Sequence, residues 1–383
     1  MSAQLNAPGR LNGPVLAMGL AGLVVGIAIT IASLMYSGHA AFNTTNDGVS
    51  WGLPVAVYVF FVLASTGLTF VASLAMVFGM REYYPIAKRC VWLAAATLIA
   101  GFASLAFELG HPFRMLWAIP LSFQISSAMN WMGLFYTLYL VFLLLKFSRM
   151  HAGDWDSGAS RNLGLASFLT VIVAHGTLGL VFGMMAMRPF WYDGLMPIYF
   201  LATAFLSGLA LAVFITHLAY GFSTQNMPAR IAALLAGALP RVFAFALGLV
   251  ILFVAFRTIT GLWSNADGLE AFHWMVRSPW FWIEAAALIV AFYILMSPGM
   301  REAARPQTVA SVLVLAAIAI GRYEFVIGGQ VVPLFKGTWV PGLIEYVPSL
   351  TEWMIALAAI SLALALYAFG EKALDLGAEP KAG

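Results

Sequence analysis

The chain has 383 residues, of which 62% are hydrophobic and only 9% are charged, and its formal net charge is +3. So few polar side chains cannot cover a soluble globule of this size, so the composition excludes a soluble protein and predicts one embedded in lipid. The weak positive charge indicates no nucleic-acid partner.

Apolar runs recur along the whole chain, each about as long as the roughly 20-residue helix that crosses 30 Å of hydrocarbon. Reading these runs between polar breaks predicts ten transmembrane helices, joined by loops too short for a large soluble domain. The predicted helices are 14–36, 53–79, 89–109, 128–147, 162–187, 197–221, 233–259, 280–297, 308–327 and 350–370. The predicted fold class is therefore an all-α polytopic membrane protein.

Charges divide unevenly between the two ends of these helices. With the N-terminus inside, the loops on that side carry most of the lysines and arginines, and the positive-inside rule then places both termini in the cytoplasm. Acidic residues gather at the opposite ends, among them Glu108, Glu284, Glu324 and Glu352. Most tryptophans lie there too, in a bias stronger than membrane anchoring requires, which indicates a docking or ligand face.

Glu108, His111 and Arg114 lie within seven residues at the outer end of the third predicted helix, which Pro112 ends. Ionisable groups are costly inside a bilayer, so each is a candidate for function. One interpretation is a site that accepts protons from, or hydrogen-bonds to, a redox-active ring. The alternative is a salt bridge among the three side chains in a loop.

Arg322 and Glu324 lie near the outer end of the ninth predicted helix. Because they are two residues apart, their side chains point to different sides of the helix and need separate partners. Glu284 and Glu352 are possible partners on neighbouring helices. For most of these charges the sequence favours an ordinary interhelical ion-pair network over a functional site.

Two histidines could suggest a haem, but their depths do not match. His175 lies near the middle of the fifth predicted helix and His217 near the inner end of the sixth, a mismatch of roughly 15 Å at 1.5 Å per residue. The single cysteine, Cys90, cannot hold an iron–sulfur cluster, and the sequence contains no metal-ligand cluster. We therefore expect no bound haem or cluster, and His175 is either a proton relay or a core histidine bonded to a carbonyl.

Four stretches of the sequence resemble the polysulfide-reductase membrane-subunit family, also called the NrfD/PsrC family. They are 49–52 with Tyr58, 108–114 with 126–133, His175 with 188–191, and 322–324 with 328–330, 346–349 and Glu352. Glu108 stands where the family more often has aspartate. The later stretches are similar to the ten-helix branch, which includes the membrane subunits of the Dsr sulfur-metabolism complex, a periplasmic hydrogenase and alternative complex III.

The resemblance implies two four-helix bundles, formed by helices two to five and six to nine and flanked by helices one and ten. It implies a subunit without haem or iron–sulfur cluster that exchanges electrons with menaquinone or ubiquinone bound in the first bundle. The implied partners are an external ferredoxin-like four-cluster iron–sulfur subunit, and also a cytochrome c and other membrane subunits. No catalysis is expected from the isolated chain beyond the quinone site.

On this reading, the chain divides into four parts along its length. Residues 1–50 form the N-terminal arm, first helix and outer loop, and residues 51–188 form the first, quinone-binding bundle. Residues 189–330 form the second bundle, and residues 331–383 form the last helix and a cytoplasmic tail.

The residues and the resemblance together predict the site. Glu108 and His111 are expected to exchange the protons of the quinone ring, with Arg114, Tyr58 and Trp131 binding it.

A further hypothesis is a proton route toward the cytoplasm through His175, Glu284, Glu324 and Arg322. An unbroken apolar barrier would instead leave proton exchange at the outer side.

Two other classes of membrane protein stay open. A secondary transporter would show interrupted helices and charges at mid-membrane, and a purely structural anchor would lack a quinone pocket.

Overall fold

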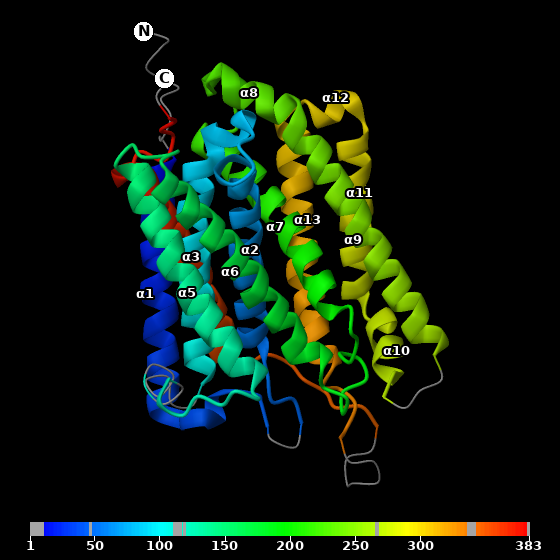
Figure 1. Cartoon of the computed structure of the whole chain (residues 1–383). Coiled ribbons are helices and arrows are strands. Elements are labelled where there is room, and N and C mark those ends of the chain that lie inside the picture. The colour runs from blue at the N-terminus through cyan, green and yellow to red at the C-terminus, as the bar shows by residue number, and fades with distance from the viewer. Residues whose placement is uncertain are drawn as a thin grey trace.

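The computed structural model describes residues 11–45, 48–109, 117, 120–264, 268–334 and 342–380. Within these residues, ten helical segments are long and apolar enough to cross a membrane, and the chain is a multi-pass integral membrane protein. The prediction of an all-α polytopic fold is confirmed (Figure 1). The long helices are α1 (Asn12–Ser37), α2 (Leu53–Met76), α3 (Tyr84–Glu108), α5 (Ala128–His151), α6 (Gly158–Gly183), α7 (Met196–Ala219), α9 (Ala238–Trp263), α11 (Pro279–Met296), α13 (Ala304–Gly328) and α14 (Leu350–Ala373).

Short helices appear where the sequence predicted only loops or a continuous span. They are α8 (Ala229–Ala236), α10 (Glu270–Arg277) and α12 (Pro298–Arg301). Helix α10 buries Ala271, Phe272 and Met275, and its eight residues are too few to cross a membrane. Helix α9 continues to Trp263, four residues past its predicted end at 259.

Helix α2 lies at the centre of the molecule and buries nearly all of its residues. Packing contacts join α2, α3, α5 and α6 in one ring, here called the first helix group, and α7, α9, α11 and α13 in a second helix group. The two groups meet where Gly67 of α2 faces Gly208 of α7, because a Cβ on either glycine would overlap the backbone of the other helix. Small residues permit such close approach in membrane helices.

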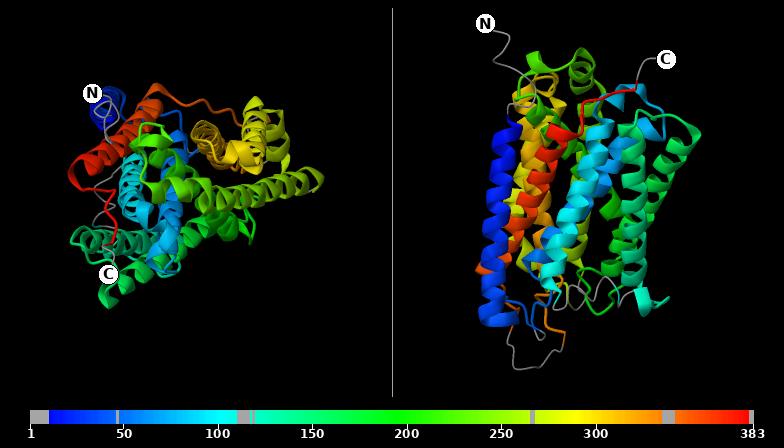
Figure 2. Two further views of the ribbon diagram at one scale, coloured as in Figure 1. Left: turned by 90° about the horizontal axis from the view of Figure 1, so that it is seen from above. Right: turned by 90° about the vertical axis from the view of Figure 1, so that its left-hand side faces the viewer.

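Helices α1 and α14 pack antiparallel to each other beside the first group (Figure 2). The start of α1 and the end of α14 therefore lie at the same end of the molecule, here called the terminal end. The opposite end, here called the Glu108 end, carries the start of α2 and the end of α3.

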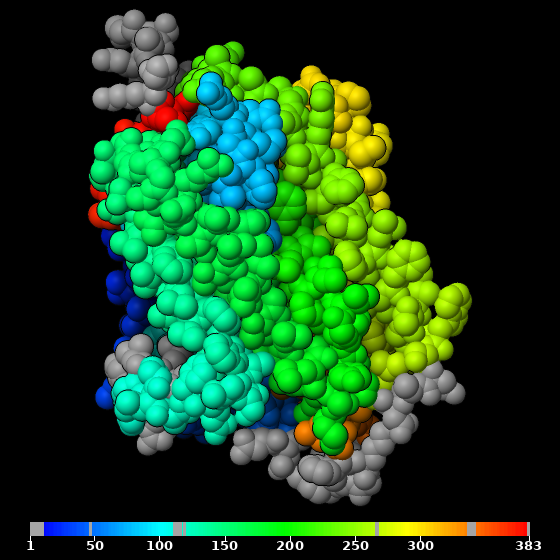
Figure 3. Space-filling model, in the orientation of Figure 1, coloured from blue at the N-terminus to red at the C-terminus, as the bar shows by residue number. Residues whose placement is uncertain are grey.

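Large apolar side chains cover the outward faces of the helices. The surface facing the viewer in Figure 3 is formed chiefly by α5, α6 and α9, with the segment before α7 between α6 and α9 in its lower part. Exposed residues of these three helices include Leu145, Leu169, Leu252 and Phe256. Such a continuous apolar surface fits contact with lipid hydrocarbon.

Candidate functional site

Glu108, at the end of α3, reaches the start of α2. Its Oε1 accepts a hydrogen bond from the backbone N–H of Gly52 at 3.1 Å. The first N–H groups of a helix have no partner within the helix and carry a partial positive charge, so they favour a carboxylate. The second oxygen, Oε2, is buried, and no described residue hydrogen-bonds to it. Among the described residues, the carboxylate is thus held through one oxygen only.

Tyr346 and Glu352 complete this arrangement beside Glu108. The Tyr346 hydroxyl accepts from the N–H of Leu53 at 2.7 Å and donates to Glu352 Oε1 at 2.5 Å. Glu352 is fully buried and also accepts from the N–H of Ser349, in the capping box that begins α14. Burial first, and then the hydrogen bond to Glu352, raise the pKa of Tyr346, so its hydroxyl stays protonated and works as a donor.

Gly52 is required where these groups converge. A Cβ at this position would overlap Glu352 Oε1 and lie 2.7 Å from the Tyr346 hydroxyl. Only glycine leaves room for two carboxylates and a phenol around one helix start. We call Gly52, Glu108, Tyr346 and Glu352 the Glu108 centre.

Gln330 binds the segment just before α2 to the end of α13. Its Oε1 accepts from the N–H groups of Ser50 and Trp51 at 2.9 and 3.0 Å, and its Nε2 donates to the carbonyl of Trp51 at 3.0 Å. The Trp51 ring stacks on Trp191, with ring centroids 5.5 Å apart. These contacts hold the segment that leads into α2, and with it the Glu108 centre, against the second helix group.

A second polar centre lies within the second helix group. The Arg322 guanidinium donates to the hydroxyl of Thr203 and lies over the rings of Phe200 and Tyr199, 4.5 and 5.0 Å from their centroids. Glu284 is its acidic neighbour across a small cavity of about 10 Å³, which is large enough for one water. We call Thr203, Glu284 and Arg322 the Arg322 centre.

A buried pair of ring side chains lies in the first helix group. The Tyr136 hydroxyl and His175 Nδ1 are 2.9 Å apart, and both side chains are fully buried. The Phe102 ring lies 5.7 Å from Tyr136 and 5.5 Å from Tyr58. The Tyr58 hydroxyl donates to the sulfur of Met132 at 3.7 Å. Polar side chains thus continue from the Glu108 end of α2 toward the middle of the bundle.

The comparisons with known proteins agree with this architecture. The model of the family described as polysulphide reductase, NrfD, matches residues 41–334. The chain belongs to the NrfD family. It is 24% identical to a selenate reductase subunit of Mesobacillus selenatarsenatis, over 83% of this chain and 84% of that one. It is also 24% identical to the Hdr-like menaquinol oxidoreductase integral membrane subunit of Archaeoglobus fulgidus, over 87% of both chains. A polysulfide reductase chain of Wolinella succinogenes is 25% identical, over 50% of this chain and 65% of its own.

Some predicted site residues of this NrfD-family chain lie together, and others do not. Tyr58 lies six residues, or roughly 9 Å, along α2 from Gly52. Trp131 lies at the start of α5, where its Nε1 donates to the carbonyl of Ile125 at 2.7 Å. His111 and Arg114 lie outside the described residues.

The charges on α13 separate as their spacing predicts. Arg322 faces α7, while Glu324 faces the first turn of α11 at Ser278 and Phe281. Glu352, considered as a partner for these charges, instead binds Tyr346 and Ser349.

Sequence reasoning did not give Tyr346, Gln330 or Tyr136 a role in the NrfD-family site. Tyr346 and Leu53 are 293 residues apart, and Gln330 and Ser50 are 280 apart, so no local pattern connects them. The signal that could have found Tyr346 and Gln330 is the set of N–H groups at the start of α2 that have no partner within the helix and require acceptors from elsewhere in the fold.

Proposed function

We propose that this chain is the quinone-reactive membrane subunit of a respiratory electron-transfer complex. It exchanges electrons between membrane quinone, either menaquinone or ubiquinone, and an external iron–sulfur or cytochrome subunit. Membership of the NrfD family and the similarity to a menaquinol oxidoreductase membrane subunit support this. The observation that carries the proposal is the buried Oε2 of Glu108, which no described residue binds, on a carboxylate held at a helix start.

The chemistry assigned to the site is proton exchange. Converting a quinone to its quinol takes up two electrons and two protons, and the reverse releases them. Glu108 Oε2 gives or takes one proton and His111 the other, while Arg114 tunes the carboxylate or contacts the partner. Tyr58 and Trp131 line the ring, and Gly52 N–H holds Glu108 Oε1 throughout.

Partners and electrons come from outside this chain in the proposal. An external ferredoxin-like subunit with four iron–sulfur clusters docks at the Glu108 end, with a cytochrome c and other membrane subunits as further components. The chain itself contributes no haem or cluster. Residues 51–188 then form the quinone-binding part and residues 189–330 the second bundle, flanked by 1–50 and 331–383.

The proposed location is the cytoplasmic membrane of a bacterium or archaeon, with both termini in the cytoplasm. The basic residues concentrated in the loops of the terminal end support this orientation. The Glu108 end then faces outward, where an external electron-transfer subunit can reach it.

The proposal includes a proton route toward the cytoplasm through His175, Glu284, Arg322 and Glu324. The His175–Tyr136 contact and the one-water cavity between Glu284 and Arg322 support it. The complex in proteoliposomes is expected to acidify or alkalinise the lumen during quinone turnover. Turnover without any change of pH or membrane potential would exclude the route and leave the quinone site untouched.

The test of the function is Glu108→Gln in the assembled complex. The amide oxygen can still accept from Gly52, but the side chain can no longer exchange a proton, so we expect quinone turnover to fall by about 100-fold or more. The matched control is Glu345→Gln, which changes an exposed carboxylate outside the Glu108 centre. Unchanged turnover in Glu108→Gln, with the subunits still co-purifying, would show that the assigned role is wrong.

A further inference from the structure

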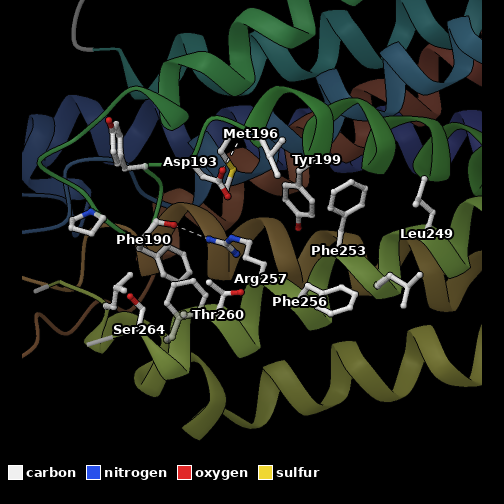
Figure 4. A pocket seen from close by; sticks show the side chains of 17 residues that line it. Phe190, Asp193, Met196, Tyr199, Leu249, Phe253, Phe256, Arg257, Thr260 and Ser264 are labelled. Atoms are coloured by element: carbon white, nitrogen blue, oxygen red, sulfur yellow. Dashed lines mark hydrogen bonds between the residues drawn. The ribbon is translucent and has the colours of Figure 1, made fainter. Parts of the chain in front are cut away.

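A cavity of about 600 Å³ lies in the second helix group, well separated in sequence from Glu108. It is lined by α7, α9, the segment before α7 and the start of α10 (Figure 4). Its volume is in the range of small-molecule and cofactor sites. Aliphatic and aromatic side chains form most of its wall: Tyr199, Leu249, Leu252, Phe253, Phe256 and Phe272.

Arg257 places a cationic donor in this apolar wall. Its guanidinium donates to the carbonyl of Phe190 at 2.9 Å and lies 4.5 Å from the centroid of the Phe190 ring. None of the described residues forms an ion pair with it. A guanidinium carries five N–H donors, and the described hydrogen bonds use one. A charge is costly in a membrane helix, and this one lies beside a cavity that can hold an acceptor.

We propose that this cavity is a second quinone site, in which a carbonyl oxygen of the ring accepts a hydrogen bond from Arg257. The tail then runs along Leu249 and Leu252, which are 41% and 55% exposed and open the cavity to lipid. The choice of ligand rests on the proposed function, because quinone is the membrane substrate assigned to the complex.

The lining favours a neutral planar ring over a phospholipid. Asp193 lines the same cavity, and its carboxylate would repel a phosphate near Arg257. Arg257 lies six residues, or roughly 9 Å, before the end of α9, which is deep for a phosphate group. Figure 4 shows the Arg257 guanidinium among aromatic rings, and such rings pack well on a flat conjugated ligand.

The cavity lies beside the Arg322 centre, which belongs to the proposed proton route. Tyr199 lines this cavity and also the small cavity of the Arg322 centre, so the two cavities share a wall residue. A ring bound at Arg257 therefore lies next to the proposed proton route. Both proposed quinone sites lie at the Glu108 end of the first two helices of their group, α2 with α3 and α7 with α9.

The test is photolabelling of the intact complex with an azido-naphthoquinone, followed by peptide mapping. We expect two labelled regions, one around 52–62 and 100–109 and another around 190–199 and 249–264. Leu252→Trp fills the cavity mouth and keeps the ring from reaching Arg257, so labelling of the second region should fall by about tenfold, the loss expected when the hydrogen bond to that charged group no longer forms. Phe245→Trp is the matched control, because Phe245 is 75% exposed on the same helix and does not line the cavity.

Arg257→Met should have the same effect as Leu252→Trp, and Arg257→Lys should retain labelling. If Arg257→Met does not accumulate, the comparison of Leu252→Trp with Phe245→Trp still tests the second site. Labelling confined to the first region overturns the second site and leaves the proposed function standing. A photoreactive phospholipid that labels the second region, and that the naphthoquinone does not displace, also overturns it. Absence of label from both regions counts against the proposed function itself.

Discussion

The Glu108 centre and the Arg322 centre each hold a carboxylate in a membrane protein, the half-buried Glu108 and the buried Glu284, but they stabilise it differently. Glu108 is held by the backbone N–H of Gly52 at the start of α2. Glu284 instead faces the side-chain cation of Arg322. The first partner is a fixed dipole of the main chain, and the second is a full charge that itself needs compensation.

This difference teaches which carboxylate can exchange a proton at low cost. Protonation of Glu108 leaves Gly52 N–H bonded to a neutral acceptor, so no charge is stranded. Protonation of Glu284 leaves the buried Arg322 charge without its acidic neighbour. The Glu108 centre therefore suits repeated proton exchange with a substrate. At the Arg322 centre, Glu284 can take up a proton at low cost only when another negative charge lies near Arg322.

The largest effect should come from separating the two helix groups. Gly67→Val places a side chain against the backbone of Ala204 and Gly208, so α2 and α7 must move apart. We expect a loss of about 3 kcal/mol or more in the free energy of unfolding, together with loss of function at both centres. Thermal unfolding in detergent measures it.

The control for this substitution is Gly176→Val on α6, where a Cβ meets nothing within 4 Å. Equal destabilisation by the two substitutions would mean that valine harms these helices by propensity alone. The contact between the groups would then not be the feature that holds both centres.

The next prediction contrasts the two carboxylates directly. Glu284→Gln leaves Arg322 without its neighbouring negative charge, and we expect it to lower the free energy of unfolding by about 2 kcal/mol. Glu108→Gln keeps an acceptor for Gly52 and should cost less than about 1 kcal/mol. Denaturant unfolding of the two variants tests the difference.

A double variant sharpens this contrast. Arg322→Gln combined with Glu284→Gln should recover part of the stability lost in Glu284→Gln, because the uncompensated charge is gone. Additive losses in the double variant would show that the two side chains are not coupled.

Tyr346→Phe tests the hydroxyl that joins the two acids of the Glu108 centre. It leaves the N–H of Leu53 and Oε1 of Glu352 without this partner, and we expect a loss of about 1–2 kcal/mol in unfolding free energy. The raised pKa of Tyr346 means that its contribution is fully present below the unfolded-state pKa of about 10 and is lost as pH rises above it. The difference from wild type should therefore stay constant between about pH 6 and 9. Tyr36→Phe, at a residue that is 94% exposed, is the control.

The sequence was sufficient for the spans and for the position of Glu108, because both depend on local patterns of hydrophobicity and charge. It was insufficient for the partners of Glu108, because Gly52, Tyr346 and Glu352 meet only when α2, α3 and α14 pack together. The roles of Glu108 and His111 remain predictions.

Arg257 shows the second limit. It lies inside the predicted helix 233–259, and the rings of Phe190, Phe272 and Phe325 have their centroids 4.5–5.2 Å from its guanidinium and shield the charge. Two of those rings come from outside the second group's spanning helices, in the segment before α7 and in α10. The sequence of α9 alone therefore does not predict this shielding.

The smallest effect belongs to Asp154, a partly exposed carboxylate that gives the reference for Glu108 and Glu284. Asp154 accepts from Arg149 at 2.8 Å and from Ser157, and these hydrogen bonds lower its pKa. Its stabilisation is present above the unfolded-state pKa of about 3.9 and is lost as pH falls through the lower folded-state pKa. Asp154→Asn should therefore lower Tm slightly near neutral pH, and the difference should disappear in acid and shrink with added salt. A difference that persists in acid would mean that the loop geometry, and not the charge, is responsible.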